Sequence, residues 1–485
     1  MKLFRLLVIG ALPLLFSPIA IMADDASPKT TENAFITKPY LQIGRTPAPG
    51  ALEVLWHSPD SNVDWSVEYR GDETGDWKKS DLPSSRRVAV SGVEPHRVYR
   101  AVLTNLSPGS TCHYRVLKAG QVVFTAKART PKSAGQAYRF VAFGDCGAGS
   151  AEQKPLARRA FASEPDFVVI PGDIVYERGL IVDYRKKFWP VYNADEPTAA
   201  GVPLIRSVPF VAAPGNHDLG TRDLNKYPDA LAYYLYWSQP LNGPLGAEGG
   251  PLVPALAASD ANRHAFVEAA GDAYPRMANF SFDYGNAHWT ILDSNPYVNW
   301  TDASLKSWIA SDLASAQNAT WRFVVFHHPG FNSSRVHYEE QQMRLLAPTF
   351  EAGKVDIVFN GHVHNYQRSF PLKFVPDKQG MPLYGGKDNN AVHGRLVTGL
   401  WQLDKSFDGR SNTKPNGVIY LITGAGGQHL YNPEQTDDPD SWQKFTDKFF
   451  STSHSLTVAD VDGKTITIRQ VTADGREVDR FSVTK

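Results

Sequence analysis

Short stretches of alternating apolar and polar residues occupy positions 33 to about 131. Residues 52–56, 65–69 and 99–106 are each rich in the residue types that favour β-strands. Turn-forming residues, such as Ser107-Pro108-Gly109, separate these stretches. About six or seven short strands within about 100 residues are typical of a β-sandwich. We therefore expect an all-β N-terminal domain over residues 33–131.

Beyond this region, short apolar runs end in polar loops and alternate with helical stretches. Asp302, for example, is expected to cap a helix that carries Leu305 and Ile309 on one face. Such alternation predicts a layered α/β domain over residues 138–485, with a functional site beyond the carboxyl ends of its strands. The expected buried strands lie at residues 139–143, 167–170, 209–213, 323–326 and 355–359.

Residues from about 220 to 280 interrupt this pattern and are predicted to form an insertion. Its aromatic residues could stack against a ring of a substrate, or they could pack against a helix. The sequence leaves both interpretations open. The aromatic residues at the start of the insertion are Tyr233, Tyr234, Tyr236 and Trp237.

The first 23 residues have the pattern of a secretory signal. Lys2 and Arg5 precede an apolar stretch over residues 6–23, and acidic residues follow it. An uncleaved membrane anchor is the alternative, because about 18 apolar residues nearly span a bilayer. We expect residues 1–23 to be a signal peptide and the mature protein to be secreted or periplasmic, without membrane attachment.

Composition narrows the function classes. The 50 basic residues balance the 50 acidic residues, so no excess of positive charge points to nucleic acid as a partner. Two cysteines cannot form a disulfide framework. For Cys112 and Cys146, a single bridge, a contact between Cys146 and a metal, and packing as free thiols all stay open. The sequence does not predict an oligomeric state.

Metal-type side chains follow the predicted strands. Histidines cluster between His217 and His364, and carboxylate, amide and phenol groups precede or join them. Neutral imidazole and carboxylate suit Zn, Fe and Mn ions, and one carboxylate can bridge two ions about 3.5–4 Å apart. Because these motifs recur after successive apolar runs, the sequence predicts a binuclear metal site rather than a set of structural histidines.

Five blocks of this part of the chain resemble those of the purple acid phosphatases, which are binuclear metallophosphoesterases. The resemblance spans about residues 138–430, and residues 33–131 resemble the fibronectin type III module of the longer, plant-type members. It implies a four-layer αββα catalytic domain. The blocks are Gly144-Asp145-Cys146-Gly147, Gly172-Asp173-Ile174-Val175-Tyr176, Gly215-Asn216-His217-Asp218, Val324-Val325-Phe326-His327 and Gly361-His362-Val363-His364.

The resemblance also implies a role for each ligand. Asp173 would bridge an Fe(III) ion and a divalent Zn, Fe or Mn ion. Tyr176 must ionise to bind, and a phenol with a pKa near 10 does so only beside a highly charged ion, which favours Fe(III) and would colour the protein. The iron ligands would be Asp145, Tyr176 and His364, and the ligands of the second ion would be Asn216, His327 and His362.

Two further histidines are candidates for catalysis. His337 occupies the position of a substrate-facing histidine in the family, ten residues after His327, and would donate a proton to the leaving alcohol. His217, directly after a ligand, would contact the phosphate at the rim of the site. His328 is expected to be structural, and Arg368 is expected to pair with a carboxylate behind the site.

The resulting hypothesis is a secreted acid phosphatase. It would hydrolyse small phosphate monoesters by attack of a metal-bound hydroxide at a binuclear Fe(III)–M(II) centre. A phosphodiesterase that uses the same metals is one alternative, and a non-catalytic extracellular binding protein is another. The sequence does not identify the physiological substrate.

Overall fold

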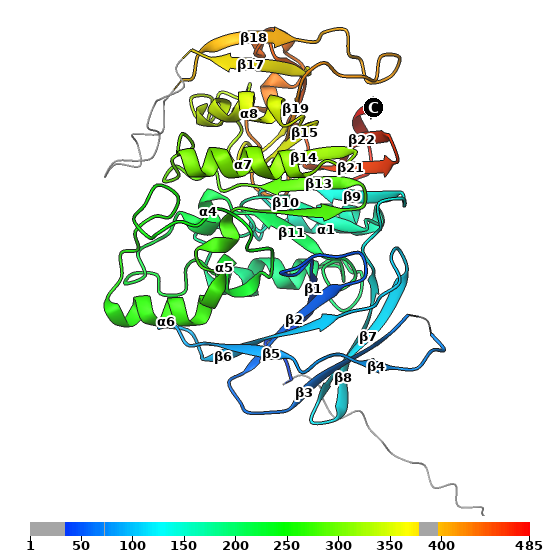
Figure 1. Ribbon diagram of the computed structural model, residues 1–485, viewed down its shortest axis with the longest axis vertical. Coiled ribbons are helices and arrows are strands. Elements are labelled where there is room, and N and C mark those ends of the chain that lie inside the picture. The colour runs from blue at the N-terminus through cyan, green and yellow to red at the C-terminus, as the bar shows by residue number, and fades with distance from the viewer. Residues whose placement is uncertain (1–33, 72, 378–395) are drawn as a thin grey trace, which may run out of the picture. The chain divides into compact units, whose positions relative to one another are not determined.

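The computed structural model describes residues 34–71, 73–377 and 396–485 (Figure 1). The predicted signal segment, residues 1–23, lies outside the described residues. Within them, we find no helix with the length and apolar character needed to cross a bilayer.

The N-terminal region is all-β, and apolar side chains fill the space between two facing sheets. Trp56, Trp65 and Tyr114 are buried there. In β3, buried and half-buried positions alternate, as the sequence pattern predicts for a strand with one face in a core. The strands of this region are β1 (Thr37–Gln42), β2 (Leu52–Pro59), β3 (Trp65–Arg70), β4 (Lys78–Lys79), β5 (Ser84–Val88), β6 (His96–Leu103), β7 (Thr111–Lys118) and β8 (Gln121–Arg129).

The C-terminal region contains two large sheets and a two-stranded hairpin (Figure 1). One large sheet includes β9 (Tyr138–Ala142), β10 (Phe167–Pro171), β11 (Phe210–Ala213), β21 (Ser455–Asp462), β22 (Thr465–Thr472) and β23 (Glu477–Thr484). The other consists of β12 (Phe280–Tyr284), β13 (Ala287–Ile291), β14 (Trp321–Val325), β15 (Ile357–Asn360), β16 (Tyr366–Ser369), β19 (Ile419–Thr423) and β20 (Thr446–Phe450), and the hairpin pairs β17 (Leu372–Pro376) with β18 (Gly399–Leu403).

The first of these sheets continues into the N-terminal region. Its strand order is β23-β22-β21-β9-β10-β11-β1-β2-β6-β5, and β1 pairs with β11 in parallel at Gln42 and Phe210. The hydroxyl of Tyr114 also donates a hydrogen bond to the carbonyl of Arg206 at 3.0 Å. The β-sandwich therefore shares one sheet with the α/β region, an arrangement that depends on long-range strand pairing.

The side chains of the central strands alternate between two cores. In β10, Phe167 and Val169 face the other large sheet, whereas Val168 and Ile170 face the helical side. Because both faces are covered, every residue of β10 is buried and the strand reads as a continuous apolar run. The core between the sheets is largely aromatic and includes Phe140, Phe167, Trp289, Phe323 and Phe359.

Helices cover the outer faces of both sheets. Leu156 of α1 joins the core of the ten-stranded sheet, and Leu313 of α7 joins that of the seven-stranded sheet. Asp302 caps α7, as predicted, by accepting hydrogen bonds from the backbone N–H groups of Ser304 and Leu305 at 2.9 and 3.1 Å. The α-helices are α1 (Gln153–Ala162), α2 (Ile181–Asp183), α3 (Trp189–Tyr192), α4 (Asn216–Leu219), α5 (Tyr233–Tyr236), α6 (Asp260–Ala270), α7 (Ala303–Ser315) and α8 (Ala347–Ala352).

Shorter helical turns connect these elements. The segment η2 (Tyr184–Phe188) is a π-helix between α2 and α3. The 3₁₀ turns are η3 (Gly271–Ala273), η4 (Arg276–Ala278), η5 (Gln342–Leu346), η7 (Pro433–Gln435) and η8 (Pro439–Ser441).

The aromatic residues of the predicted insertion belong to the core. Tyr233 and Tyr236 are fully buried, and Trp237 is 1% exposed. The Trp237 indole donates a hydrogen bond to the hydroxyl of Tyr184 at 3.0 Å. Of the two interpretations that the sequence leaves open, the structure therefore shows packing.

Both cysteines are buried free thiols. Burial raises the pKa of Cys112 to about 12 and raises that of Cys146 well above its usual range. Cys146 donates a weak hydrogen bond to the carbonyl of Ile174 at 3.7 Å. The bridge is therefore not formed, and the thiols pack as small apolar groups.

The ionisation of the buried His288 should make the free energy of unfolding depend on pH. Burial disfavours the charged form of His288, but hydrogen bonds with Asp283 at 2.7 Å and Asp312 at 3.1 Å outweigh this and raise its pKa from 6.5 to about 9. A raised pKa stabilises the fold fully below pH 6.5, and this contribution disappears as the pH rises through 9. At about 1.4 kcal/mol per pKa unit, the fall is at most about 3.5 kcal/mol.

Urea unfolding at pH 6 and pH 9.5 measures this fall. The His288→Gln variant should be less stable at pH 6 and should show a smaller decrease between the two pH values. An equal decrease in both proteins would assign the pH dependence to other groups.

Candidate metal centre

The metal-type side chains lie beyond the carboxyl ends of β9, β10, β11, β14 and β15. These strands run parallel within their two sheets, so their ends meet at one edge of the sheet pair. Asp145, Asp173 and His362 have positive φ angles of 58°, 50° and 67°, which turn their side chains sharply out of the strand direction. Gly172 leaves space there, because a Cβ atom on it would lie 2.4 Å from Nδ1 of His327.

One group of side chains contains a phenol. The hydroxyl of Tyr176 donates a hydrogen bond to Oδ1 of Asp145 at 2.9 Å and lies 3.3 Å from Nε2 of His364. The same nitrogen lies 3.4 Å from Oδ1 of Asp145. His364 donates its other N–H, at Nδ1, to the carbonyl of His429 at 2.8 Å. Its Nε2 lone pair therefore faces the group.

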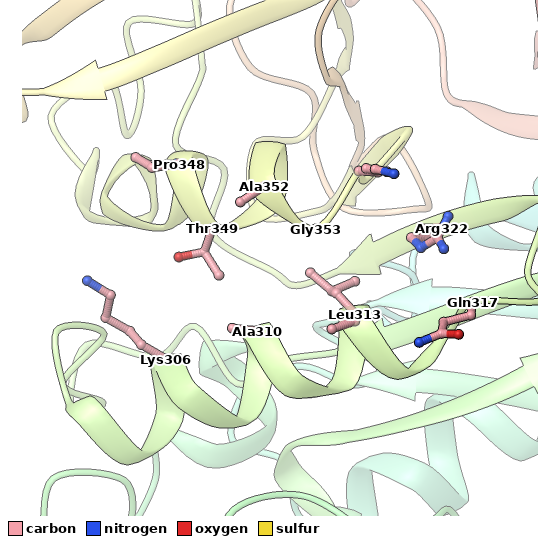
Figure 2. A pocket seen from close by; sticks show the side chains of 11 residues that line it. Lys306, Ala310, Leu313, Gln317, Arg322, Pro348, Thr349, Ala352 and Gly353 are labelled. Carbon is pink, nitrogen blue, oxygen red and sulfur yellow. The ribbon is translucent and has the colours of Figure 1, made fainter.

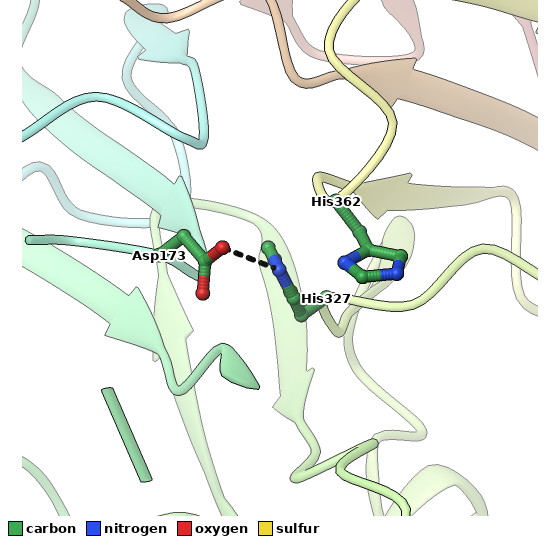
Figure 3. Close-up of side chains that lie close together, drawn as sticks. All are labelled: Asp173, His327 and His362. Carbon is green, nitrogen blue, oxygen red and sulfur yellow. Dashed lines mark ion pairs between the residues drawn. The ribbon is translucent and has the colours of Figure 1, made fainter. Parts of the chain in front are cut away.

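A second group surrounds His327. Nε2 of this residue lies 3.2 Å from Oδ2 of Asp173 and 3.1 Å from Oδ1 of Asn216, while its Nδ1–H donates to the carbonyl of Pro171 at 2.8 Å. Ligand atoms of Asp173, His327 and His362 lie within 4.8 Å of one another (Figure 3). A backbone carbonyl that orients an imidazole in this way is typical of metal-binding histidines.

The two groups are contiguous. Nε2 of His327 lies 4.0 Å from Oδ1 of Asp145, and Asp173 also accepts a hydrogen bond from the backbone N–H of His217 at 2.9 Å. The structure thus brings all seven predicted ligands into one cluster. The donor set of carboxylate, imidazole, amide and phenol fits first-row metal ions. The assignment of individual ligands to individual ions stays a prediction.

The buried carboxylates of the cluster favour the binding of cations. Burial, together with the nearby carboxylates of Asp145 and Asp173, raises the pKa of Tyr176 well above its usual range. Burial disfavours a charged His327, but the Asp173 carboxylate outweighs this and raises the pKa to about 9. Burial and then the charge of His337 lower the pKa of His362 to about 4. Two buried carboxylates therefore attract positive charge strongly.

Both candidate catalytic histidines lie at the rim of the cluster. The side chain of His217 is 28% exposed, and its Nδ1–H donates to the carbonyl of Glu177 at 2.7 Å. The side chain of His337 is 26% exposed, and its ring centroid lies 4.0 Å from that of His362. Both rings are therefore partly open to solvent beside the cluster, where they could meet a substrate.

The sequence analysis missed a buried carboxylate at this rim. Oε1 of Glu340 lies 2.7 Å from Nδ1 of His337, and Oε2 lies 2.8 Å from Nε2 of His362. The second contact leaves Nδ1 of His362 as the nitrogen available to a metal. The His-x-x-Glu spacing of residues 337 and 340 was the available sequence signal, but only the fold brings Glu340 to His362.

The neighbouring polar residues have structural contacts. His328 is buried, and its Nδ1 lies 2.9 Å from the hydroxyl of Ser294, in agreement with the predicted structural role. Asp218 accepts hydrogen bonds from the backbone N–H groups of Gly215 and Ile174 and so joins two of the ligand loops. Burial and the Asp173 carboxylate raise its pKa to about 7.

A large cavity lies elsewhere. It has a volume of about 620 Å³ and is lined by α7 residues such as Lys306 and Leu313 and by α8 residues such as Thr349 (Figure 2). Arg322 lines it at the start of β14, whereas His327 follows the end of that strand, so the two residues are about 16 Å apart along an extended chain. This cavity is therefore separate from the cluster.

Comparisons with known proteins identify relatives. The calcineurin-like phosphoesterase family matches residues 138–366. Purple acid phosphatase 21 of Arabidopsis thaliana is 25% identical over 329 residues, which are 66% of this chain and 64% of that protein. Purple acid phosphatase 18 of the same plant is 36% identical over 206 residues, 41% of this chain and 38% of that protein. The aligned part thus spans less than two thirds of either relative.

A solved structure shares the fold. Purple acid phosphatase PPD1 from yellow lupin (Lupinus luteus) seeds aligns with a TM-score of 0.60 at 17% identity and covers 92% of this chain and 74% of that chain. The matched family, the plant relatives and this shared fold support a metal-dependent phosphoesterase. Together with the five sequence blocks, they support the resemblance of this chain to the purple acid phosphatase family.

Proposed function

We propose that this protein is a secreted acid phosphatase that hydrolyses small phosphate monoesters. The observation that carries the proposal is the single cluster of seven ligand-type side chains with two partly exposed histidines at its rim. The N-terminal segment with the pattern of a signal peptide supports secretion.

The two contiguous groups support two metal ions. The first group would hold Fe(III), because its buried phenol ionises only beside a highly charged cation. The second would hold Zn, Fe or Mn, and Asp173 would bridge. Two such ions polarise phosphate oxygens and lower the pKa of water. The first group is Asp145, Tyr176 and His364, and the second is Asn216, His327 and His362.

The histidines at the rim would contact the substrate. Nδ1 of His337 is engaged by Glu340, so Nε2 is the atom that would give a proton to the leaving alcohol. Nδ1 of His217 is engaged by the carbonyl of Glu177, so its Nε2 would contact a phosphate oxygen.

Replacing Tyr176 with phenylalanine should remove the colour that we expect of the iron-loaded protein. The substitution deletes only the hydroxyl that contacts Asp145 and His364, so the phenolate-to-iron charge-transfer band should be lost while the fold is kept. Visible absorption spectra of protein loaded with Fe(III) and zinc measure this. Tyr431→Phe is the control, because it also removes one hydroxyl beside the cluster but keeps the ring that stacks on His364 at 4.1 Å, so the band should remain. Equal bands in all three proteins would contradict phenolate ligation by Tyr176.

The proposed activity is tested by initial rates on 4-nitrophenyl phosphate and bis(4-nitrophenyl) phosphate. We expect a strong preference for the monoester after loading with iron plus zinc or manganese. A preference for the diester would favour the phosphodiesterase alternative, and no hydrolysis of either ester would favour a binding protein. The buried insertion aromatics give the diesterase alternative no support, because they cannot stack against a substrate.

A further inference from the structure

A second, smaller cavity lies beside the segment that carries His337. It has a volume of about 220 Å³ and is lined by aromatic, polar and basic side chains. Tyr338 lines it directly after His337, and consecutive Cα atoms are about 3.8 Å apart. The residue that directly follows the proposed proton donor in the chain therefore forms part of the cavity wall. The lining residues on which the inference depends are Tyr338, Arg344, Trp401, Gln443 and Lys444.

The buried wall of this cavity contains an arginine. Arg344 is 4% exposed and donates hydrogen bonds to the carbonyls of Gly330 at 2.6 Å and Val397 at 3.1 Å. Its guanidinium carbon lies 5.0 Å from the ring centroid of Trp401 and 5.3 Å from that of Phe331. Burial lowers its pKa to about 10. Over residues 34–71, 73–377 and 396–485, no carboxylate forms an ion pair with it. A buried cation without a carboxylate partner favours an anionic ligand.

The other walls suit a planar ring. The Trp401 side chain is on β18 and is 41% exposed, although the ring packs against Phe445 at 5.4 Å with nearly parallel planes. Tyr338 is held by a 3.4 Å hydrogen bond from its hydroxyl to Oε1 of Gln443. Lys444 is exposed at this cavity and adds a second cation. An aromatic face and two cations therefore line one cavity, and none of its lining residues is acidic.

We propose that this cavity binds the leaving group of the substrate, and that the leaving group is a planar ring bearing a carboxylate or another anionic group. The ring would stack on Trp401, and the anion would meet Arg344 and Lys444. This inference rests on the proposed phosphatase function, because it places the leaving group next to His337. It narrows the substrate class to anionic aryl or heteroaryl phosphates.

A matched pair of substrates tests whether the cavity prefers a negatively charged ring substituent. 4-Carboxyphenyl phosphate and 4-carbamoylphenyl phosphate have similar shape and differ in the charge of the ring substituent. We expect kcat/KM to be about tenfold higher for the carboxylate ester, because hydrogen bonds to charged groups are stronger than those to neutral groups. Lys444→Met should lower this ratio severalfold, whereas Lys464→Met, an exposed lysine in the turn between β21 and β22, should leave it unchanged. Equal kcat/KM values for both esters in the unmodified protein would overturn the inference.

A second pair of variants tests whether the ring of the leaving group stacks on Trp401. Trp401→Ala should lower kcat/KM for the carboxylate ester about tenfold relative to glycerol phosphate, which has no ring to stack. Leu400→Ala is the control on the same strand, because that side chain is 75% exposed and does not line the cavity. If both variants lowered kcat/KM equally, the loss would come from disturbing the β17–β18 hairpin. That result would overturn the proposed stacking contact.

Direct binding separates failure of this inference from failure of the proposed function. 4-Hydroxybenzoate, the product of the carboxylate ester, should inhibit competitively, and calorimetry should show binding that Lys444→Met weakens. Non-competitive inhibition would overturn the assignment to the leaving group. If no ester is hydrolysed, the proposed function fails, and retained binding of 4-hydroxybenzoate would still support the cavity as a site for anionic rings. Absence of both binding and hydrolysis would overturn both.

Discussion

Asp173→Asn should lower turnover of an aryl phosphate monoester at least about a thousandfold, since removing a single preorganised contact from an active site already costs about 10²–10³. Asp173 lies 3.2 Å from Nε2 of His327 in the second group and also interacts with Tyr176 of the first group. Asparagine keeps the shape and one acceptor oxygen but loses the negative charge that would hold two cations. Bound metal should therefore fall together with activity, while the fold is retained.

The measurement combines metal analysis by mass spectrometry with initial rates. Asp166→Asn is the matched control, because Asp166 immediately precedes β10 and Asp173 follows its other end. Asp166 is buried and accepts a hydrogen bond from the backbone N–H of Arg139 at 2.8 Å. Its replacement should reduce stability but leave metal content and turnover near those of the unmodified protein. Full activity of Asp173→Asn would reject the proposed metal centre.

Arg368→Met should destabilise the fold by about 3–5 kcal/mol, the usual cost of leaving a buried charge without its partner. Arg368 is 6% exposed and donates two hydrogen bonds to Asp479, at 2.7 and 3.2 Å, and a third to Asp447. Asp447 lies on β20 and Asp479 on β23, so this residue connects the two large sheets. The carboxylate pairing expected from the sequence is present, and it is structural.

Urea unfolding at neutral pH measures this loss. Arg480→Met is the control, because its side chain is 58% exposed and pairs with Glu477 at 3.4 Å, an ion pair of at most about 1 kcal/mol. Neither residue contacts the metal cluster, so the folded fraction of each variant should hydrolyse the monoester at the normal rate. Similar losses of stability in the two variants would show that the link between the sheets contributes little.

Local patterns in the sequence determined much of this protein. The apolar runs before Asp145, Asp173 and His327 predicted buried strands with polar residues at their ends, and the structure has strands there. This works because a strand that is buried on both faces must be apolar throughout, whereas the loop after it is free to carry ligands. The Asp302 cap of α7 is likewise a local signal. The resemblance to the purple acid phosphatases likewise rests on these local blocks, and the similar proteins support it.

Only the tertiary structure decided the features that depend on long-range contacts. Whether Trp237 stacks with a substrate or packs in the core depends on Tyr184, which lies 53 residues earlier. The pairing of β1 with β11 joins the N-terminal strands to the catalytic sheet across 168 residues. Glu340 reaches His362, and Arg344 meets Trp401, through the packing of separate elements. Hydrophobic periodicity records which face of an element is buried, but it does not record which partner covers that face.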